Sequence, residues 1–224
     1  MVRGLVVGVL SCLLMNSAYA EGLLYDPEPP ADSAYVRVMV VAASEALTVQ
    51  VDGKPHGARL ERGAPSDYMV IPAGKHAITL SAVGHHEAQY AATLDIIAGR
   101  AMTVTFSALD AKAPPLLFED HANANKLKAV LAVYPLAPRA AALDIRSADG
   151  KVSVFNGLTP GVMRTITVNP VKITLAVFQK AHSLTTLSLD MAPGGTYSIM
   201  LLPAPHDGVR AHVVQNKVER YTGK

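Results

Sequence analysis

Leu47-Thr48-Val49-Gln50-Val51-Asp52-Gly53-Lys54 decides the fold, because an alternating apolar segment runs into a turn and both recur in outline. The Asp-Gly-Lys element returns as Asp149-Gly150-Lys151, 97 residues later (149 − 52 = 97). Leu94-Asp95 likewise returns as Leu189-Asp190 after 95 residues (189 − 94 = 95). Alternation at period two is typical of half-buried strands, and Asp-Gly favours a hairpin turn. A repeat far longer than the roughly 20–50 residues of solenoids indicates two similar β modules.

Short apolar segments and turns follow each other through both copies, over residues 35–109 and residues 128–224. In residues 35–41 apolar side chains recur at every second position, as in a strand with one buried face. No helical segment alternates with these strand candidates, which favours antiparallel sheets. We therefore expect an all-β fold of two tandem antiparallel β-sandwich, immunoglobulin-like modules, the second ending in a charged tail.

Residues 1–20 have the three parts of a secretion signal. Arg3 supplies the positive start, residues 5–14 the apolar centre, and Ala18-Tyr19-Ala20 the cleavage site. We expect a signal peptide that is cleaved after Ala20, followed by an extended, proline-containing segment over residues 21–34. No later run approaches the roughly 18 apolar residues of a membrane helix, so no transmembrane segment is predicted in the mature chain.

Composition restricts the chemistry of the exported chain. Without Arg3 it has 19 basic residues (20 − 1 = 19) against 18 acidic ones, with no concentrated basic stretch. Nucleic acid is therefore not an expected partner. The only cysteine, Cys12, lies in the expected signal peptide and should leave with it. Disulfides, a catalytic thiol and thiolate metal sites are thereby excluded.

The densest histidine group is His85-His86-Glu87, with His76 upstream. Adjacent strand residues point to opposite faces, and no second spaced pair of ligands is present. We predict no metal site and no cofactor.

Acyl-transfer machinery is also missing from the motifs. There is no G-x-S-x-G element, and His206-Asp207 has no loop serine beside it, so no catalytic residue is predicted. A tyrosine platform for a sugar face stays open, since five tyrosines fall in strand-end or loop contexts: Tyr25, Tyr35, Tyr90, Tyr134 and Tyr221.

Residues 110–127 form the expected inter-module linker. Its apolar Leu116, Leu117 and Phe118 should pack into the junction and hold the modules at a fixed angle. Asp120 is a candidate N-cap for a short helix over residues 122–128. The linker is therefore predicted to be structured.

Three stretches of the chain share their residues and spacing with one known family. They are Leu-Tyr-Asp-Pro-Glu-Pro-Pro-Ala-Asp-Ser-Ala-Tyr-Val-Arg-Val over residues 24–38, Phe-Glu-Asp through Asn-Ala-Asn-Lys-Leu-Lys-Ala over 118–129, and Val-Asn-Pro-Val-Lys-Ile-Thr-Leu-Ala-Val-Phe over 168–178. They resemble AlgF, the periplasmic family of bacterial alginate O-acetylation. One departure is Tyr134-Pro135-Leu136-Ala137, where the family reads Tyr-Asn-Leu-Thr.

The resemblance implies a periplasmic role in O-acetylation during exopolysaccharide (alginate) biosynthesis. In that system a membrane protein moves acetyl across the inner membrane, and periplasmic acetyltransferases place it on the polymer. Because no catalytic motif is found, we expect an accessory adaptor that links the membrane acetyl-transfer protein with those acetyltransferases, with alginate as an open third partner. The alternatives are a catalytic alginate O-acetyltransferase subunit and a mannuronate-binding module.

An adaptor needs docking surfaces, and the segments beside the repeat are the first candidates. Each candidate also has a structural interpretation: Tyr25 could fill its own module's core, Arg37 could be a solvated strand residue, and Phe118 could only cement the junction. The candidate partner-interface residues are Tyr25, Asp26, Arg37, Phe118, Glu119, Asp120, Asn123 and Asn125.

Overall fold

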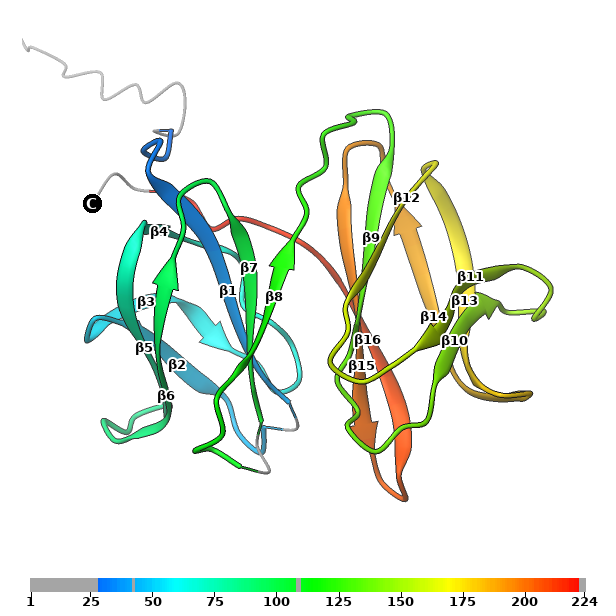
Figure 1. The fold of residues 1–224 in the computed structure, drawn as a ribbon, viewed down its shortest axis with the longest axis horizontal. Coiled ribbons are helices and arrows are strands. Elements are labelled where there is room, and N and C mark those ends of the chain that lie inside the picture. The colour runs from blue at the N-terminus through cyan, green and yellow to red at the C-terminus, as the bar shows by residue number, and fades with distance from the viewer. Residues whose placement is uncertain (1–27, 42, 108–109, 222–224) are drawn as a thin grey trace, which may run out of the picture.

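A computed structural model of the 224-residue chain describes residues 28–41, 43–107 and 110–221. The described part consists of strands and connecting turns and contains no helix, so the predicted all-β class is confirmed (Figure 1). Within it, no helix has the length and apolar character needed to cross a membrane. The predicted signal peptide and residues 21–27 lie outside the described residues.

In the described residues the first sandwich has eight strands in two sheets, with orders β4-β1-β7-β8 and β3-β2-β5-β6. Every neighbouring pair is antiparallel except β1 and β7, which run parallel. Its strands are β1 (Ser33–Val41), β2 (Leu47–Val51), β3 (Lys54–Leu60), β4 (Met69–Pro72), β5 (Gly74–Ala82), β6 (Ala88–Ile96), β7 (Ala101–Ser107) and β8 (Leu116–Asp120).

The second sandwich repeats this plan strand by strand. Its sheets have the orders β12-β9-β15-β16 and β11-β10-β13-β14, again with one parallel pair, β9 and β15. The strands are β9 (Ala129–Pro135), β10 (Leu143–Ser147), β11 (Ser153–Leu158), β12 (Arg164–Val168), β13 (Val171–Gln179), β14 (His182–Met191), β15 (Thr196–Ala204) and β16 (Gly208–Gln215). The prediction of β-sandwiches is confirmed, with the addition of a parallel pair in each; the immunoglobulin-like assignment stays a prediction.

Asp52 and Gly53 form the hairpin turn between β2 and β3. Asp52 and Gly53 both have positive φ (52° and 75°), which suits the two-residue turn that matches strand twist. The Asp52 carboxylate accepts the Ala77 N–H at 2.9 Å and lies 2.7 Å from His76 Nδ1. These contacts, the Ala77 bond foremost, lower the pKa of Asp52. The hairpin is thereby tied to β5, the next strand of its sheet.

Each sandwich encloses its own apolar core. In β1 the even-numbered valines point into the first core, and in β9 the odd-numbered residues point into the second. Strand β9 is buried at every position, on both of its faces. A strand covered on both faces reads as a continuous apolar run. The second face of β9 is covered by the other sandwich.

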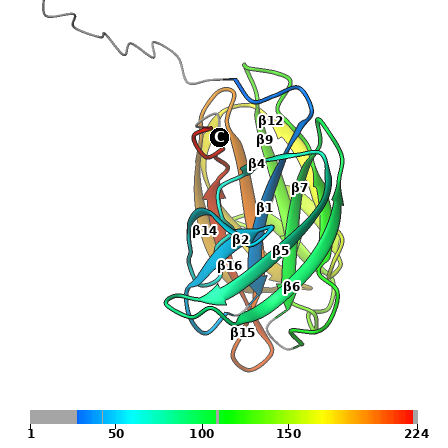
Figure 2. The same cartoon turned by 90° about the vertical axis from the view of Figure 1, so that its left-hand side faces the viewer.

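The sandwiches are stacked through one sheet of each, so that β1, β7 and β8 face β9, β15 and β16 (Figures 1 and 2). We call this contact between the sandwiches the seam. At its centre is a third apolar cluster to which both sandwiches contribute, made of Met39, Phe118, Ala132, Tyr134, Leu136, Met200 and Leu202. The modules are therefore packed against each other over an apolar surface of their own.

Two connecting segments differ from their expectations. Residues 116–120, expected in the linker, form strand β8 at the edge of the first sandwich's seam sheet. Residues 121–128 then form a loop and a turn in place of the expected short helix. The Asn123 side chain explains the difference: it donates to the carbonyl of Lys128 (2.9 Å) and accepts the N–H of Asn125 (3.0 Å), so it closes the loop.

The tail after β16 returns to the first sandwich. The Tyr68 N–H donates to the Lys217 carbonyl (2.8 Å), and the Glu219 N–H donates to the Tyr68 carbonyl (2.9 Å). His56 Nδ1 lies 3.0 Å from a Glu219 carboxylate oxygen. Burial raises the pKa of Glu219, and the nearby His56 opposes that rise. The tail is thus a second connection between the modules.

Candidate functional site

Arg37 is the central side chain of the seam. It lies on β1 between valines that point into the first core, so its own side chain points at the second sandwich, where it is 1% exposed. A buried guanidinium needs hydrogen-bond acceptors for its N–H groups. Arg37 finds them on both modules.

The guanidinium of Arg37 makes four hydrogen bonds. In the first module Nε donates to Thr103 Oγ1 (2.8 Å). The other three acceptors belong to the second module: Asn216 Oδ1 (2.8 Å), the Tyr134 hydroxyl (3.0 Å) and Ser198 Oγ (2.9 Å). The Tyr68 and Tyr134 rings also lie against the cation, at 4.7 and 5.3 Å from their centroids. One arginine therefore joins the two modules.

Asp120, at the end of β8, supplies the negative charge of the network. Its carboxylate accepts hydrogen bonds from the hydroxyls of Tyr68 (2.7 Å), Thr103 (2.6 Å) and Tyr134 (2.5 Å). Thr103 and Tyr134 each accept from Arg37 and donate to Asp120. The two charges are thus connected through hydroxyl groups, and each hydroxyl proton has a fixed acceptor.

This environment holds the two tyrosines in their neutral form. Burial is the largest cause that raises the pKa of Tyr134, to about 12, with the nearby Asp120 adding to the rise and Arg37 opposing it. Burial and Asp120 also raise the pKa of Tyr68 strongly. Neither phenol is activated as a nucleophile or base near neutral pH.

The network has an internal symmetry that follows from the repeat. Strand pairing matches Arg37 with Thr103 in the first module and Ala132 with Ser198 in the second, at one offset (132 − 37 = 95; 198 − 103 = 95). Ser198 donates to Asn216 (2.8 Å) as Thr103 donates to Asp120. Equivalent hydroxyls from both copies therefore meet around Arg37, whose own equivalent is Ala132.

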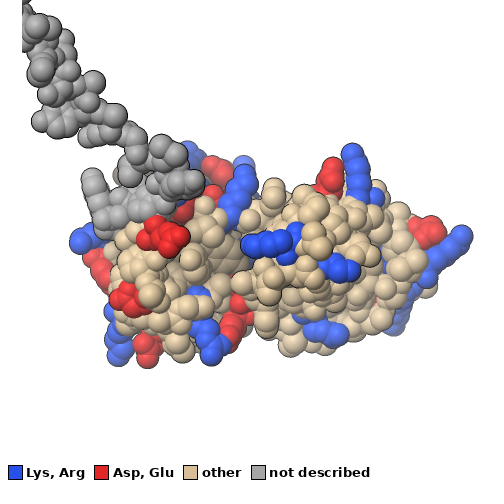
Figure 3. Space-filling model, turned by 90° about the horizontal axis from the view of Figure 1, so that it is seen from above, with Lys and Arg blue, Asp and Glu red and all other residues tan. Residues whose placement is uncertain are grey.

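The two ends of the seam differ. The end near the start of β1 is polar, and a pocket of about 460 Å³ there includes Tyr35, Asp120, Lys126 and Lys217 in its wall. Seen from this end, basic and acidic side chains are interspersed over both modules (Figure 3). At the other end lies a cavity of about 610 Å³ lined mostly by apolar residues of both modules.

The predicted interface residues divide into three groups. Tyr25 and Asp26 lie outside the described residues. Arg37 points away from its own core, but the second module covers it, so it is not available to another protein while the modules are packed. Phe118 is 6% exposed, and its ring packs edge-to-face on the Tyr134 ring, with the two centroids 5.4 Å apart. This contact agrees with the structural interpretation, in which Phe118 packs in the junction between the modules. Asp120 is half-buried and belongs to the network around Arg37.

The remaining candidates are accessible. Glu119 is exposed and pairs with Arg100. Asn125 is exposed in the loop between β8 and β9, where its side chain accepts the Leu127 N–H (2.9 Å). Asn123 is half-buried in the same loop. Among the linker residues expected to pack, Leu116 and Leu117 are instead 48% and 51% exposed, because β8 is an edge strand.

The other polar candidates are dispersed. In the described residues no group of three or more His, Cys, Asp or Glu side chains is placed to hold a metal ion. His76 pairs with Asp52, and Asp207 pairs with Arg139 at 3.6 Å. Of the tyrosines considered for a sugar platform, Tyr90 and Tyr134 are buried.

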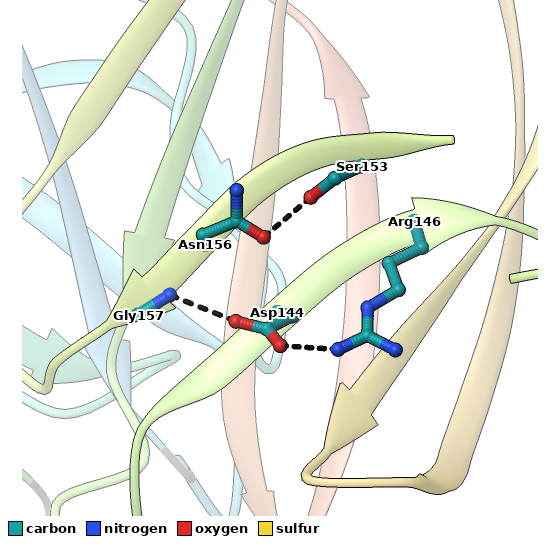
Figure 4. A network of polar contacts seen from close by, with 5 residues as sticks. All are labelled: Asp144, Arg146, Ser153, Asn156 and Gly157. Carbon is teal, nitrogen blue, oxygen red and sulfur yellow. Dashed lines mark hydrogen bonds and ion pairs between the residues drawn. The ribbon is translucent and has the colours of Figure 1, made fainter. Parts of the chain in front are cut away.

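A second polar cluster lies on the outer sheet of the second module (Figure 4). Asp144 accepts the Gly157 N–H (2.8 Å) and pairs with Arg146 (2.7 Å), while Ser153 bonds to Asn156. The Gly157 bond is the largest cause of the lowered pKa of Asp144, and Arg146 contributes. This cluster is local to β10 and β11 and does not reach the seam.

Sequence reasoning missed Thr103, Ser198 and Asn216 as members of one site. All three accept hydrogen bonds from Arg37, from which they are separated by 66, 161 and 179 residues of sequence. A usable signal was present: residues 129–136 are apolar without interruption, which is typical of a strand buried on both faces. That signal predicts a second layer against β9.

Taken together, the fold and the seam define a duplicated β-sandwich protein whose halves are joined by a buried polar network. A family model described as "Alginate O-acetyl transferase AlgF" matches residues 7–192. The chain belongs to this AlgF family, and therefore takes part in alginate O-acetylation. No curated protein matches the chain.

Solved structures give further similarities. The C-terminal domain of AlgF from P. aeruginosa is 25% identical, with a TM-score of 0.37 over 41% of this chain and 100% of that one. A putative cell adhesion protein from Bacteroides ovatus and CBMbc (family CBM26) from Eubacterium rectale Amy13K, in complex with maltoheptaose, are each 10% identical. Both have TM-scores of 0.26 and cover 84% of this chain and 99% of theirs.

Proposed function

We propose that this chain is a periplasmic adaptor of alginate O-acetylation that links the membrane acetyl-transfer protein with the periplasmic acetyltransferases. The observation that carries the proposal is the seam. It holds two modules together, so that loops from both are presented at one end in a defined arrangement.

Exposed apolar side chains at this end offer a docking surface. Ile97 (61% exposed) lies in the turn before β7, Leu127 (78%) in the loop before β9, and Val218 (52%) in the tail beside Tyr68. Asn125 lies two residues before Leu127 and accepts its N–H. Exposed apolar residues with polar neighbours are the usual composition of a protein interface.

The adaptor role is tested by capture with purified components. The immobilised chain is offered a periplasmic alginate acetyltransferase, the detergent-solubilised membrane acetyl-transfer protein, and both together. We expect each to bind alone and the pair to bind simultaneously. Failure to capture either protein would exclude the adaptor role.

A matched pair of variants locates the docking surface. Leu127→Ser should weaken capture of one partner by about tenfold, because truncating an anchor costs about 1–2 kcal/mol. Leu184→Ser, at an exposed position of β14 on the outer sheet, should leave capture unchanged. Equal effects of both variants would place the interface elsewhere.

The two alternatives give different results in the same preparation. A catalytic subunit releases or transfers acetyl from an acetyl ester without any partner, and this activity disappears in a serine or histidine variant. A mannuronate-binding module shows chemical-shift changes with mannuronate oligomers at millimolar concentration. Either result with no protein capture would replace the adaptor role.

A further inference from the structure

The cavity at the apolar end of the seam has the size of a ligand-binding site. It has a volume of about 610 Å³, which is in the range of about 300–1,000 Å³ typical of ligand pockets. Both modules line it, with Val41, Thr105 and Leu116 on one side and Leu136, Ala140 and Pro203 on the other. It is therefore continuous with the module interface.

One polar group in the cavity wall has no partner. Thr105 is 2% exposed, and its hydroxyl has no hydrogen-bond partner among the described residues. Its neighbours across the sheet are Met39 on β1 and Leu116 on β8, which offer no acceptor side chain. An unpaired buried hydroxyl costs about 1–3 kcal/mol, and a valine of the same shape would avoid that cost. A ligand with a hydrogen-bonding edge would satisfy it.

The walls favour an aromatic ring. Four proline rings line the cavity: Pro114, Pro138, Pro203 and Pro205. The C–H groups of a proline ring are weakly positive, which complements the negative face of an aromatic ring. Tryptophan combines such a face with an N–H donor at its edge. Arg139 and Asp207 form an exposed ion pair at the rim that leaves the interior apolar.

An unpaired strand edge runs beside the cavity. Strand β8 pairs with β7 on one side and, within the described residues, with no strand on the other. Leu116 and Leu117, about half exposed, lie at its start, and Leu116 is also part of the cavity wall. An exposed edge of this kind accepts an extended peptide as an additional strand.

We propose that this end of the seam is a docking site for an extended segment of a partner protein that carries a tryptophan. The indole enters the cavity, its N–H donates to Thr105 Oγ1, and the backbone on either side of it pairs with β8. The inference deepens the proposed adaptor role and rests on it for the partner. It gives the second end of the molecule a partner of its own.

The test uses the absence of tryptophan from the chain, which makes the fluorescence of an added tryptophan free of background. The full chain is titrated with the end-blocked peptide Thr-Val-Trp-Val-Thr, and separately with N-acetyltryptophanamide. We expect a saturable blue shift with both, and at least tenfold tighter binding of the peptide because its backbone extends the sheet. No shift with either overturns the proposal. Equal affinities would indicate a small-molecule pocket and overturn the docking segment.

Two variants distinguish the effect of the Thr105 hydroxyl on peptide binding from its effect on stability. Thr105→Val should weaken peptide binding about fivefold, the equivalent of one neutral hydrogen bond, while it raises the melting temperature of the free chain. The control Thr48→Val removes a hydroxyl that donates to the Ser81 carbonyl (3.2 Å) in the first sandwich. It should lower the melting temperature and leave binding unchanged. Unchanged binding in Thr105→Val would contradict the assigned role of the hydroxyl.

Filling the cavity gives a second readout. Ala140→Phe enlarges a residue of the cavity wall, so peptide binding should be lost while the circular dichroism spectrum stays that of the parent. Peptide binding that persists in this variant overturns the site. The adaptor role fails independently, when the parent chain captures neither acetylation protein. Capture that survives in Ala140→Phe overturns only the cavity's part in docking.

Discussion

The first module presents Arg37 to the seam, whereas the second presents Ala132 at the equivalent strand position. Around this difference the modules are alike: Thr103 corresponds to Ser198, and Asp120 to Asn216. Two faces with identical residues would bring two arginines together, and like charges in a buried contact repel each other. A duplicated sheet can therefore be packed on its copy when one copy supplies the cation and the other supplies acceptors.

The largest loss in the free energy of unfolding is expected for Arg37→Met, which removes the cation from the seam. The apolar volume is kept, but the buried oxygens that accept from Arg37 lose their donor, and the half-buried Asp120 loses the nearby cation. We expect a loss of about 3 kcal/mol, because buried polar groups left without a partner are costly. Urea denaturation should show that loss in the free energy of unfolding. Arg59→Met is the control, because Arg59 is exposed and makes only a 3.6 Å contact with Glu61. A loss below about 1 kcal/mol for Arg37→Met would show that the network contributes little to the seam.

Exchanging the equivalent acceptors should have a smaller and asymmetric effect. Asp120→Asn replaces one acceptor oxygen by a donor NH₂ that faces hydroxyl donors, so we expect a loss of about 2 kcal/mol in unfolding free energy. Asn216→Asp should cost less, since Arg37 Nη1 is 2.8 Å from Asn216 Oδ1 and stabilises a carboxylate there. Equal losses in the two variants would contradict this account of the asymmetry.

Tyr134→Phe tests one bridging hydroxyl. Arg37 and Asp120 keep their other partners, so the loss at neutral pH should be about 1 kcal/mol.

The same variant has a pH signature. The folded pKa of Tyr134 is raised to about 12, above the ordinary value of about 10, so its contribution is complete below pH 10 and is lost as the pH rises toward 12. The parent chain should lose stability steeply over that window, by up to about 1.4 kcal/mol per pH unit for this group. The variant should show a shallower slope in urea titrations from pH 9 to pH 12. Identical slopes would mean that Tyr134 does not titrate with unfolding.

The smallest effect is expected on the outer sheet. Arg146→Ala removes the 2.7 Å pair with Asp144 and the contact with the Phe178 ring at 5.0 Å. Both partners are partly solvated, so the free energy of unfolding should fall by less than about 1 kcal/mol. A loss as large as that of Arg37→Met would remove the distinction between the seam and the outer network.

The strands and turns of each module can be predicted from the sequence, whereas the contact between the modules cannot. Alternation in residues 35–41 and the Asp52-Gly53 turn predict the strands and the hairpin because these signals are local. The surroundings of Arg37 depend on non-local contacts, because the acceptors of its hydrogen bonds come from β7, β9, β15 and the tail. The expected helix over residues 122–128 failed because Asn123 and Asn125 bind the backbone of their own loop.

The candidate site was predictable only in part. Arg37, Phe118 and Asp120 were singled out, and all three lie at the seam, two of them in the network. The burial of Arg37 and Phe118 could have been inferred from the uninterrupted apolar run of β9, which requires a cover on its second face. The orphan hydroxyl of Thr105 gives no sequence signal, because a threonine in a strand is ordinary.

The returning tail also has a mechanical consequence. Residues 33–41 enter the first module as β1, and the tail is fastened to the same module at Tyr68, so both ends of the described chain are anchored on one body. A force that pulls these ends apart is borne first by the bonds from Tyr68 N–H to Lys217 (2.8 Å) and from Glu219 N–H to the Tyr68 carbonyl (2.9 Å). Tension reaches the second module only after these two hydrogen bonds break.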